Sequence, residues 1–148
     1  EGRTLDEAEA YGRLAGLPVA DWVALDADAP VPALPFPYPV VAKVLDAKIP
    51  HKSDAGGVVV GIDGPSALAE AVASIRANVE AHLPGHRVAR ILVQQMRAAV
   101  GEVLVGMRRD PEVGPVVVLA AGGIFTEIYR DAVMRLAPIG SADWGWKP

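Results

Sequence analysis

The chain has 148 residues, of which 51% are hydrophobic and 22% charged, and its net charge is −4. This composition is typical of a packed globular protein with one domain or two small subdomains, and it excludes a disordered chain. The negative charge argues against a nucleic-acid partner, and no apolar run approaches the ~20 residues of a membrane-spanning helix. Without cysteine, disulfides and thiolate metal sites are excluded. The acidic N-terminus lacks a secretory-signal pattern, so we expect a cytoplasmic protein.

The first 39 residues predict a helix, a short strand and a long loop. Thr4-Leu5-Asp6-Glu7 is typical of a capping box, with Thr4 as the N-cap and Glu7 reaching back to it. Apolar residues at positions 5, 8, 11 and 14 predict a helix that ends at Gly16. Residues 21–25 read as a strand, and the proline-rich residues 26–39 read as a loop.

Residues 40–82 predict two apolar strands and an amphipathic helix. Residues 40–45 and 57–62 are almost entirely apolar, as in strands covered on both faces, and their short connection favours an antiparallel pair. Gly64-Pro65 begins a helix, because proline suits the first helical position. The apolar face of this helix comprises Leu68, Ala71, Val72, Ile75 and Val79.

The rest of the chain is predicted to be mostly strand, with a turn beginning at Arg109. The expected strands are residues 90–96, 102–107, 115–120, 124–129 and 132–136. A helix, a hairpin, a second helix and a run of strands together indicate an α+β fold.

The densest group of unusual residues surrounds the first apolar strand. Its members are Lys43 within the strand, then His51, Lys52, Ser53 and Asp54, then Gly56 and Gly57. A strand, a basic loop and two glycines form a layout that holds phosphates with backbone N–H groups and ammonium groups. A histidine in such a loop can stabilise phosphate charge or accept a phosphoryl group. The loop is not of the Walker type, which requires GxxxxGK[ST] before a helix.

Simpler interpretations of these residues remain open. Lys43 can extend its ammonium group to water from a strand end, and residues 51–54 can be a solvated hairpin tip. An edge strand with outward polar residues explains Gln94, Gln95 and Glu102.

A second candidate cluster lies near the C-terminus. It comprises Gly122, Gly123, Glu127, Asp131 and Arg135. Two carboxylates near a phosphate site suggest a Mg²⁺ pair, whereas alternate strand residues facing solvent would explain them equally well.

Four motifs occur in an order that carries a family likeness: PVVAKVLDAKIPHKSDAGGV, ILVQQM, GEVLVGMRRDPEVGPVVV and GGIFTEIYRDAVMRLAPI. The chain resembles the ATP-grasp domain of ADP-forming acyl-CoA synthetases, such as acetate–CoA ligases. The resemblance implies an ATP-grasp fold, in which two α+β subdomains clamp a nucleotide. Residues 1–93 would form the first subdomain, and residues 94–148 the hinge and part of the second.

The resemblance also implies roles for the candidate residues. Lys43 and the loop of residues 51–57 would contact the ATP phosphates, and the backbone of Gln94, Gln95 and Met96 would meet the adenine. Glu102 would lie beside the nucleotide in the second subdomain. Such enzymes convert acyl-CoA, ADP and phosphate to acid, CoA and ATP through a phosphohistidine relay. His51 matches the family's histidine in this loop, and the resemblance implies that it takes part in the relay.

The likeness sets further expectations about partners and metal. Separate CoA-binding and CoA-ligase domains would handle CoA, acyl-CoA and phosphate, in the same chain or in another subunit. The hinge of the family usually reads Gln-Glu, whereas Gln94-Gln95 stands here. The family's Mg²⁺-binding strand has no counterpart in residues 140–148, so we expect the metal ligands to lie beyond this chain.

Similar domains are also fused to acetyltransferase domains in protein lysine acetyltransferases, where the ligase-like part has a regulatory role. A regulatory role of that kind is the alternative function.

Overall fold

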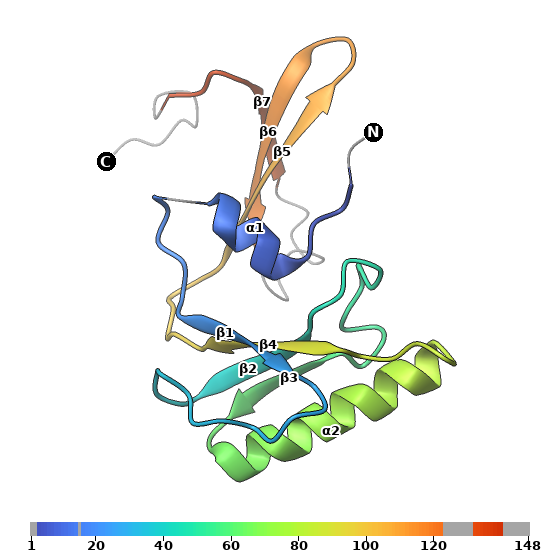
Figure 1. Ribbon diagram of the computed structural model, residues 1–148. Coiled ribbons are helices and arrows are strands. Elements are labelled where there is room, and N and C mark those ends of the chain that lie inside the picture. Colours follow the sequence, from blue (N-terminus) through green and yellow to red (C-terminus); the bar gives the residue numbers. More distant parts are fainter. Residues whose placement is uncertain (1–2, 15, 123–131, 141–148) are drawn as a thin grey trace. The chain divides into compact units, whose positions relative to one another are not determined.

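The computed structural model describes residues 3–14, 16–122 and 132–140, which contain two helices and seven strands (Figure 1). They fall into two compact units, Glu1–Arg97 and Ala98–Pro148. Both helices lie in the first unit, and each unit has its own antiparallel sheet. The predicted α+β class is confirmed.

The first unit is a four-stranded sheet with two helices. Its elements are α1 (Glu7–Arg13), β1 (Trp22–Asp26), β2 (Val40–Val44), β3 (Val58–Ile62), α2 (Pro65–His82) and β4 (Arg90–Gln95). The strand order is β1-β4-β2-β3, and all neighbours are antiparallel. The strands and the long helix lie within two residues of their predicted bounds, and β2 and β3 form the predicted antiparallel pair.

One face of this sheet forms the hydrophobic core with α2. The five apolar residues predicted for this helix face are all buried, because a 3.6-residue repeat places them on one stripe. Val40, Ala42 and Val44 of β2 belong to the same core cluster. Because side chains alternate along a strand, Lys43 faces the opposite side of the sheet. The fold therefore holds one ammonium group on a rigid strand, away from the core.

The short helix α1 begins two residues later than predicted, so the predicted capping box is wrong. Asp6 is the N-cap: its Oδ1 accepts a hydrogen bond from the backbone N–H of Glu9 at 2.8 Å, and Glu9 Oε2 accepts from the N–H of Asp6 at 3.0 Å. Asp6 also pairs with Arg90 of β4 at 2.5 Å, a contact that Thr4 cannot make. No residue of α1 is buried, so its expected apolar face does not join the core. Because Glu9 rather than Glu7 completes the capping box, the Glu7 side chain is available for other contacts.

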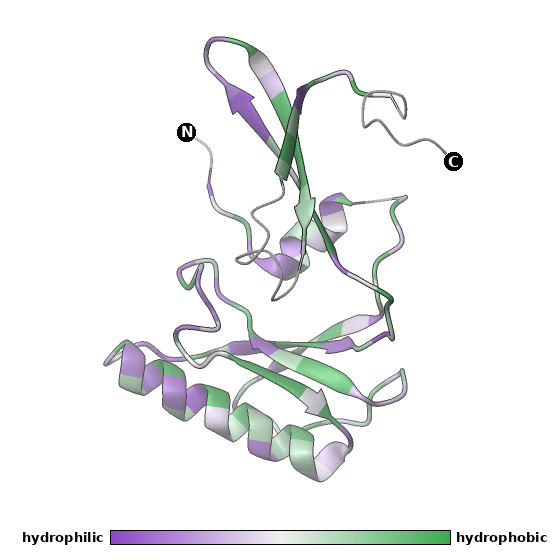
Figure 2. Cartoon of the chain, turned by 180° about the vertical axis from the view of Figure 1, so that it is seen from behind, coloured by the Kyte–Doolittle hydropathy of each residue, from purple (hydrophilic) through white to green (hydrophobic). Residues whose placement is uncertain are grey.

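The second unit is a three-stranded antiparallel sheet in the order β5-β6-β7, formed by β5 (Val103–Asp110), β6 (Gly114–Ala121) and β7 (Ala132–Leu136). The strand β5 extends three residues beyond the predicted end, so the turn begins at Pro111 rather than Arg109. The end of β5 is hydrophilic (Figure 2). Earlier in the strand, Val103, Val105 and Met107 are apolar but largely exposed. The predicted strand 124–129 lies outside the described residues.

Candidate phosphate-binding site

The ammonium group of Lys43 makes its contacts on the sheet face opposite to α2. Its Nζ donates to Glu7 Oε1 at 2.7 Å and to Gln94 Oε1 at 3.1 Å. Lys43 pairs with Leu92 across the strands, so Gln94, two residues further along β4, projects on the same face. The structure thus brings together two of the predicted site residues.

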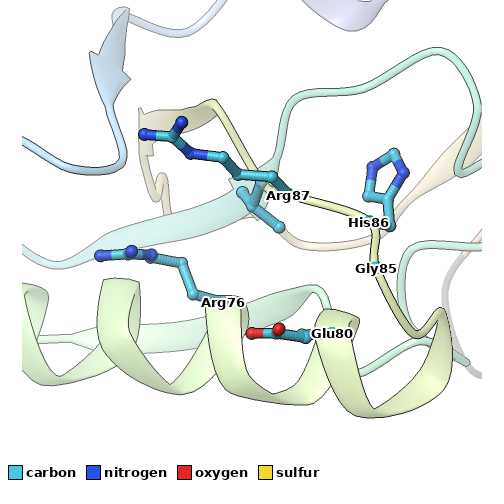
Figure 3. A pocket seen from close by; sticks show the side chains of 6 residues that line it. Arg76, Glu80, Gly85, His86 and Arg87 are labelled. Carbon is cyan, nitrogen blue, oxygen red and sulfur yellow. The ribbon is translucent and has the colours of Figure 1, made fainter.

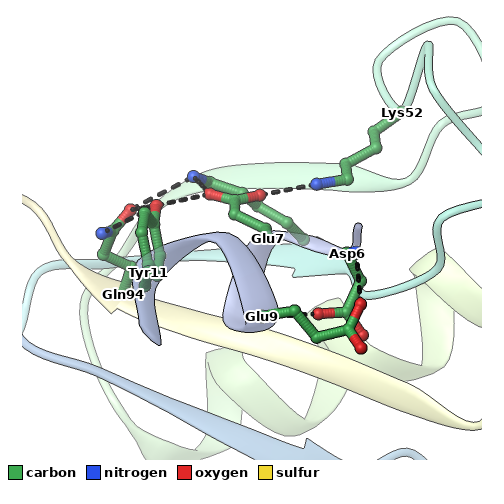
Figure 4. Close-up of polar contacts among 7 residues, drawn as sticks. Asp6, Glu7, Glu9, Tyr11, Lys52 and Gln94 are labelled. Carbon is green, nitrogen blue, oxygen red and sulfur yellow. Dashed lines mark hydrogen bonds and ion pairs between the residues drawn. The ribbon is translucent and has the colours of Figure 1, made fainter. Parts of the chain in front are cut away.

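A second ammonium group reaches the same carboxylate from the loop after β2. Lys52 Nζ lies 2.5 Å from Glu7 Oε2, and the Tyr11 hydroxyl donates to Glu7 Oε1 at 2.6 Å. Figure 4 shows Glu7 between Lys52 on one side and Tyr11 and Gln94 on the other. The side chains of Lys43, Lys52 and Glu7 are each only 19–22% exposed. Two partly desolvated cations that converge on one oxyanion form a site suited to a phosphate group.

The electrostatics of Glu7 reflect this convergence. Burial alone would raise the pKa of the Glu7 carboxyl, but hydrogen bonds from Lys43, Lys52 and Tyr11 outweigh it and lower the pKa to about 2. Burial, together with the hydrogen bond to Glu7, raises the pKa of Tyr11 to about 12. The carboxylate is therefore ionised at neutral pH, and the two lysines with Glu7 carry one net positive charge.

The loop between β2 and β3 is a compact turn whose backbone N–H groups bond within the loop. The N–H of Gly56 donates to Ser53 O at 3.0 Å, and that of Gly57 donates to Lys52 O at 2.7 Å. His51, Ser53 and Asp54 are exposed, and the His51 side chain has no hydrogen bond or ion pair in the part of the chain that the structure describes. Their contacts with a nucleotide remain a prediction.

Packing explains why the turn contains two glycines. A Cβ on Gly57 would lie 2.6 Å from Val44 Cγ1. Gly56 has a φ of +62°, and a Cβ there would lie 2.8 Å from Cβ of Asn78 in α2. The glycines let the loop sit directly on β2 and α2, which fixes the backbone of Lys52.

The predicted hinge lies at the end of β4, inside the first unit. The N–H of Gln95 donates to Asp21 O at 2.8 Å, and that of Met96 donates to Pro39 O at 3.0 Å. The Oε1 atom of Gln95 is buried and has no hydrogen-bond partner among the described residues. An orphaned buried acceptor fits a ligand that brings an N–H donor to this point.

Two of the remaining predicted residues adjoin each other in the second unit. The N–H of Gly122 donates to Glu102 O at 2.8 Å, and a Cβ on Gly122 would lie 2.9 Å from Glu102 Cβ. Gly123, Glu127 and Asp131 lie outside the described residues, and for them the predicted roles stay predictions. Among the residues that are described, no group of three or more His, Asp or Glu side chains could hold a metal ion.

The sequence interpretation missed Glu7 and Tyr11 as site residues. It assigned Glu7 to a capping box and Tyr11 to an apolar face. The spacing of four residues between an acid and a phenol is a weak local signal, since such side chains are neighbours on a helix.

A different cavity of about 270 Å³ lies between α2 and residues 85–88 (Figure 3). Arg76 and Arg87, which line it, both pair with Asp28, and His86 Nε2 lies 2.9 Å from Asp46. The side chains of Arg76 and Arg87 are 45% and 80% exposed, against 22% and 21% for Lys43 and Lys52. Solvent therefore screens the arginines more strongly, and the lysine pair is the stronger anion site. No helix in the described ranges is long and apolar enough to cross a membrane.

Residues 1–145 match the ATP-grasp domain family. The chain belongs to this family. It is 39% identical, over 97% of its length, to the beta subunit of acetate–CoA ligase [ADP-forming] I from Pyrococcus furiosus. A solved relative is the acetyl-coenzyme A synthetase 1 of Ca. Korarchaeum cryptofilum in complex with coenzyme A, Ca-AMPCP and HgCl⁺, at 31% identity, a TM-score of 0.75 and 94% coverage of this chain.

A second structure of the Korarchaeum synthetase, with coenzyme A and Mg-AMPPCP, has its phosphohistidine segment pointing towards the nucleotide-binding site. It matches 93% of this chain at 29% identity, with a TM-score of 0.62. The predicted ATP-grasp fold is therefore confirmed. The chain spans 63% of the Pyrococcus subunit and 62% and 58% of the two Korarchaeum chains.

Proposed function

We propose that this chain is the nucleotide-binding part of an ADP-forming acyl-CoA synthetase and that Lys43 and Lys52 bind the phosphates of ATP or ADP. The observation that carries the proposal is the convergence of both ammonium groups on one carboxylate, at 2.7 and 2.5 Å. A carboxylate and a phosphate present similar charged oxygens to an ammonium donor. The whole reaction would convert acyl-CoA, ADP and phosphate to acid, CoA and ATP.

The relatives support a nucleotide as the ligand. The Korarchaeum synthetase has been solved with AMPCP and with AMPPCP, which are nucleotides with a non-hydrolysable linkage. The adenine would lie at the end of β4, where Gln95 Oε1 is a buried acceptor without a described partner. The backbone of Met96 would adjoin it. Residues 1–93 would act as the first ATP-grasp subdomain, and residues 94–148 would contribute the hinge and Glu102.

Among the described residues, no group of three or more His, Asp or Glu side chains could hold a metal ion by itself. The Mg²⁺ that accompanies a nucleotide is commonly held by one or two carboxylates together with the phosphates. Mg²⁺ would neutralise part of the negative charge of the phosphates. CoA-binding and CoA-ligase domains would be the partners that supply the phosphoryl group.

The test is a calorimetric titration of ATP into the full chain and into Lys43→Ala. Loss of one charged phosphate contact costs about 1.5–3 kcal/mol, which corresponds to a Kd about 10- to 150-fold weaker. Lys48→Ala is the matched control, because this lysine is exposed in the same unit and its side chain has no partner in the described ranges. An unchanged Kd in Lys43→Ala, or no binding to the parent, would refute the proposal.

We further propose that His51 takes part in the phosphoryl relay. It sits in the same turn as Lys52, and its imidazole is exposed without a partner among the residues described. An accessible imidazole nitrogen can accept a phosphoryl group from the phosphohistidine of the CoA-ligase partner, which returns to free histidine. It can then pass this group to ADP to form ATP, which leaves the His51 imidazole unchanged after each cycle. In one structure of the Korarchaeum synthetase, the phosphohistidine segment points towards the nucleotide-binding site, which supports this proposal.

A further inference from the structure

The two lysines of the proposed phosphate site already have an anion between them. Glu7 Oε1 accepts from Lys43, and Glu7 Oε2 accepts from Lys52. Each oxygen of the carboxylate is therefore matched to one ammonium group, which is the arrangement that a bridging phosphate would adopt. Each ammonium group has further N–H donors, but a phosphate that bridges both lysines would lie against the Glu7 oxygens, and the two anions would repel each other.

The helix that carries Glu7 is held to the sheet of the first unit mainly by polar contacts. No residue of α1 is buried, whereas α2 buries five apolar side chains. Among the described residues, the attachments of α1 include the two lysine pairs of Glu7, the Asp6–Arg90 pair and a hydrogen bond from Gln94 Nε2 to the Tyr11 hydroxyl at 3.2 Å. A tilted ring contact between Tyr11 and Trp22, with centroids 5.5 Å apart, adds to them. A cavity of about 210 Å³ separates its beginning from residues 46–52. Loss of the lysine pairs would remove a large share of what fixes α1.

The charges favour exchange of one anion for the other. Lys43 and Lys52 together carry two positive charges, and Glu7 neutralises one of them. A terminal phosphate carries up to two negative charges and three acceptor oxygens, so it completes the neutralisation that a carboxylate leaves unfinished.

We propose that Glu7 is an internal competitor for the phosphate site, and that the nucleotide phosphate displaces it from Lys43 and Lys52 and thereby releases α1 from the sheet. This inference rests on the proposed function. It makes α1 an autoinhibitory element: the apparent affinity for nucleotide is lower than the intrinsic affinity by the fraction of molecules in which Glu7 has left the lysines.

The experiment compares ATP binding to the full chain, Glu7→Gln and Glu9→Gln by calorimetry at one ionic strength. Both variants remove one negative charge from α1, but Glu9 contacts Arg3 and the cap rather than the lysines. Glu7→Gln is expected to bind ATP about tenfold more tightly than the parent, since about nine-tenths occupancy of the lysines by Glu7 would hide the site to that extent. Glu9→Gln is expected to bind like the parent.

Hydrogen exchange of the parent gives a second readout that needs no variant. With saturating ATP, the amides of α1 are expected to exchange faster, while those of α2 stay unchanged. Binding of ATP that leaves α1 equally or better protected would overturn the inference, as would equal or weaker binding by Glu7→Gln. No binding by any of the three proteins would overturn the proposed function and the inference together, whereas binding with equal Kd would overturn the inference alone.

Discussion

The carboxylate of Glu7 predicts a specific dependence of stability on pH. Its pKa falls from an ordinary value of 4.5 to about 2 in the folded chain, because the hydrogen bonds from Lys43, Lys52 and Tyr11 outweigh the cost of its burial. A folded-state pKa below the unfolded value stabilises the protein above pH 4.5, and this contribution is lost as the pH falls from 4.5 towards 2. Glu7→Gln removes the charge and keeps the shape, so it removes this contribution.

The size of the effect follows from the shift in pKa. A change from 4.5 to about 2 corresponds to at most about 3.4 kcal/mol at neutral pH. The side chains of Glu7, Lys43 and Lys52 are 19–22% exposed, so solvent still screens the two pairs in part, and we expect about 1–2 kcal/mol. In Glu7→Gln both ammonium groups stay partly desolvated without their counter-ion, which increases the loss of stability rather than reducing it.

Urea unfolding followed by tryptophan fluorescence measures the difference between parent and variant. Glu7→Gln is expected to be less stable at pH 7, and the difference is expected to shrink as the pH falls below about 4.5. Glu70→Gln is the control, because Glu70 is exposed on α2 and has no ion pair in the ranges described. A difference that stays constant down to about pH 2, or no difference at pH 7, would refute the assignment of Glu7 as the counter-ion of the two lysines.

Two further predictions concern the turn between β2 and β3. Gly57→Ala is expected to destabilise the chain by about 1–3 kcal/mol in thermal or urea unfolding, since its Cβ would meet Val44 at 2.6 Å. Gly12→Ala is the control: its Cβ would meet nothing within 4 Å, so this variant is expected to be neutral or stabilising. Equal free energies of unfolding for the two variants would contradict the packing role of Gly57. His51→Asn in the complete enzyme is expected to lower the rate of ATP formation from acyl-CoA, ADP and phosphate at least about a hundredfold while leaving the Kd for ATP within twofold; turnover equal to that of the parent would exclude His51 from the relay.

Local patterns predicted the elements of the first unit well. Proline at the first helical position and a 3.6-residue apolar repeat are both encoded within α2, so its buried face could be read from the sequence. The apolar runs of β2 and β3 and their short connection likewise predicted the antiparallel pair. Thr4 and Asp6 are each followed three residues later by Glu, so two capping registers were available, and the pair with Arg90 favours the later one.

The contacts that define the candidate site could not be predicted in the same way. Lys43 and Lys52 lie 36 and 45 residues from Glu7 in the sequence, and they meet it only because α1 lies on the sheet face opposite to α2. The insertion of β4 between β1 and β2 is also non-local, and it places Gln94 beside Lys43. Periodicity identified which residues face away from the core, but not which of them converge.

Removal of both lysines is the sharpest test of the proposed phosphate site. The Kd for ATP should be measured by calorimetry for the full chain and for the double variant Lys43→Ala/Lys52→Ala. Loss of two charged phosphate contacts is expected to weaken binding by more than about a hundredfold. A double variant that binds ATP with the Kd of the parent would contradict the assignment of these two lysines to the nucleotide phosphates.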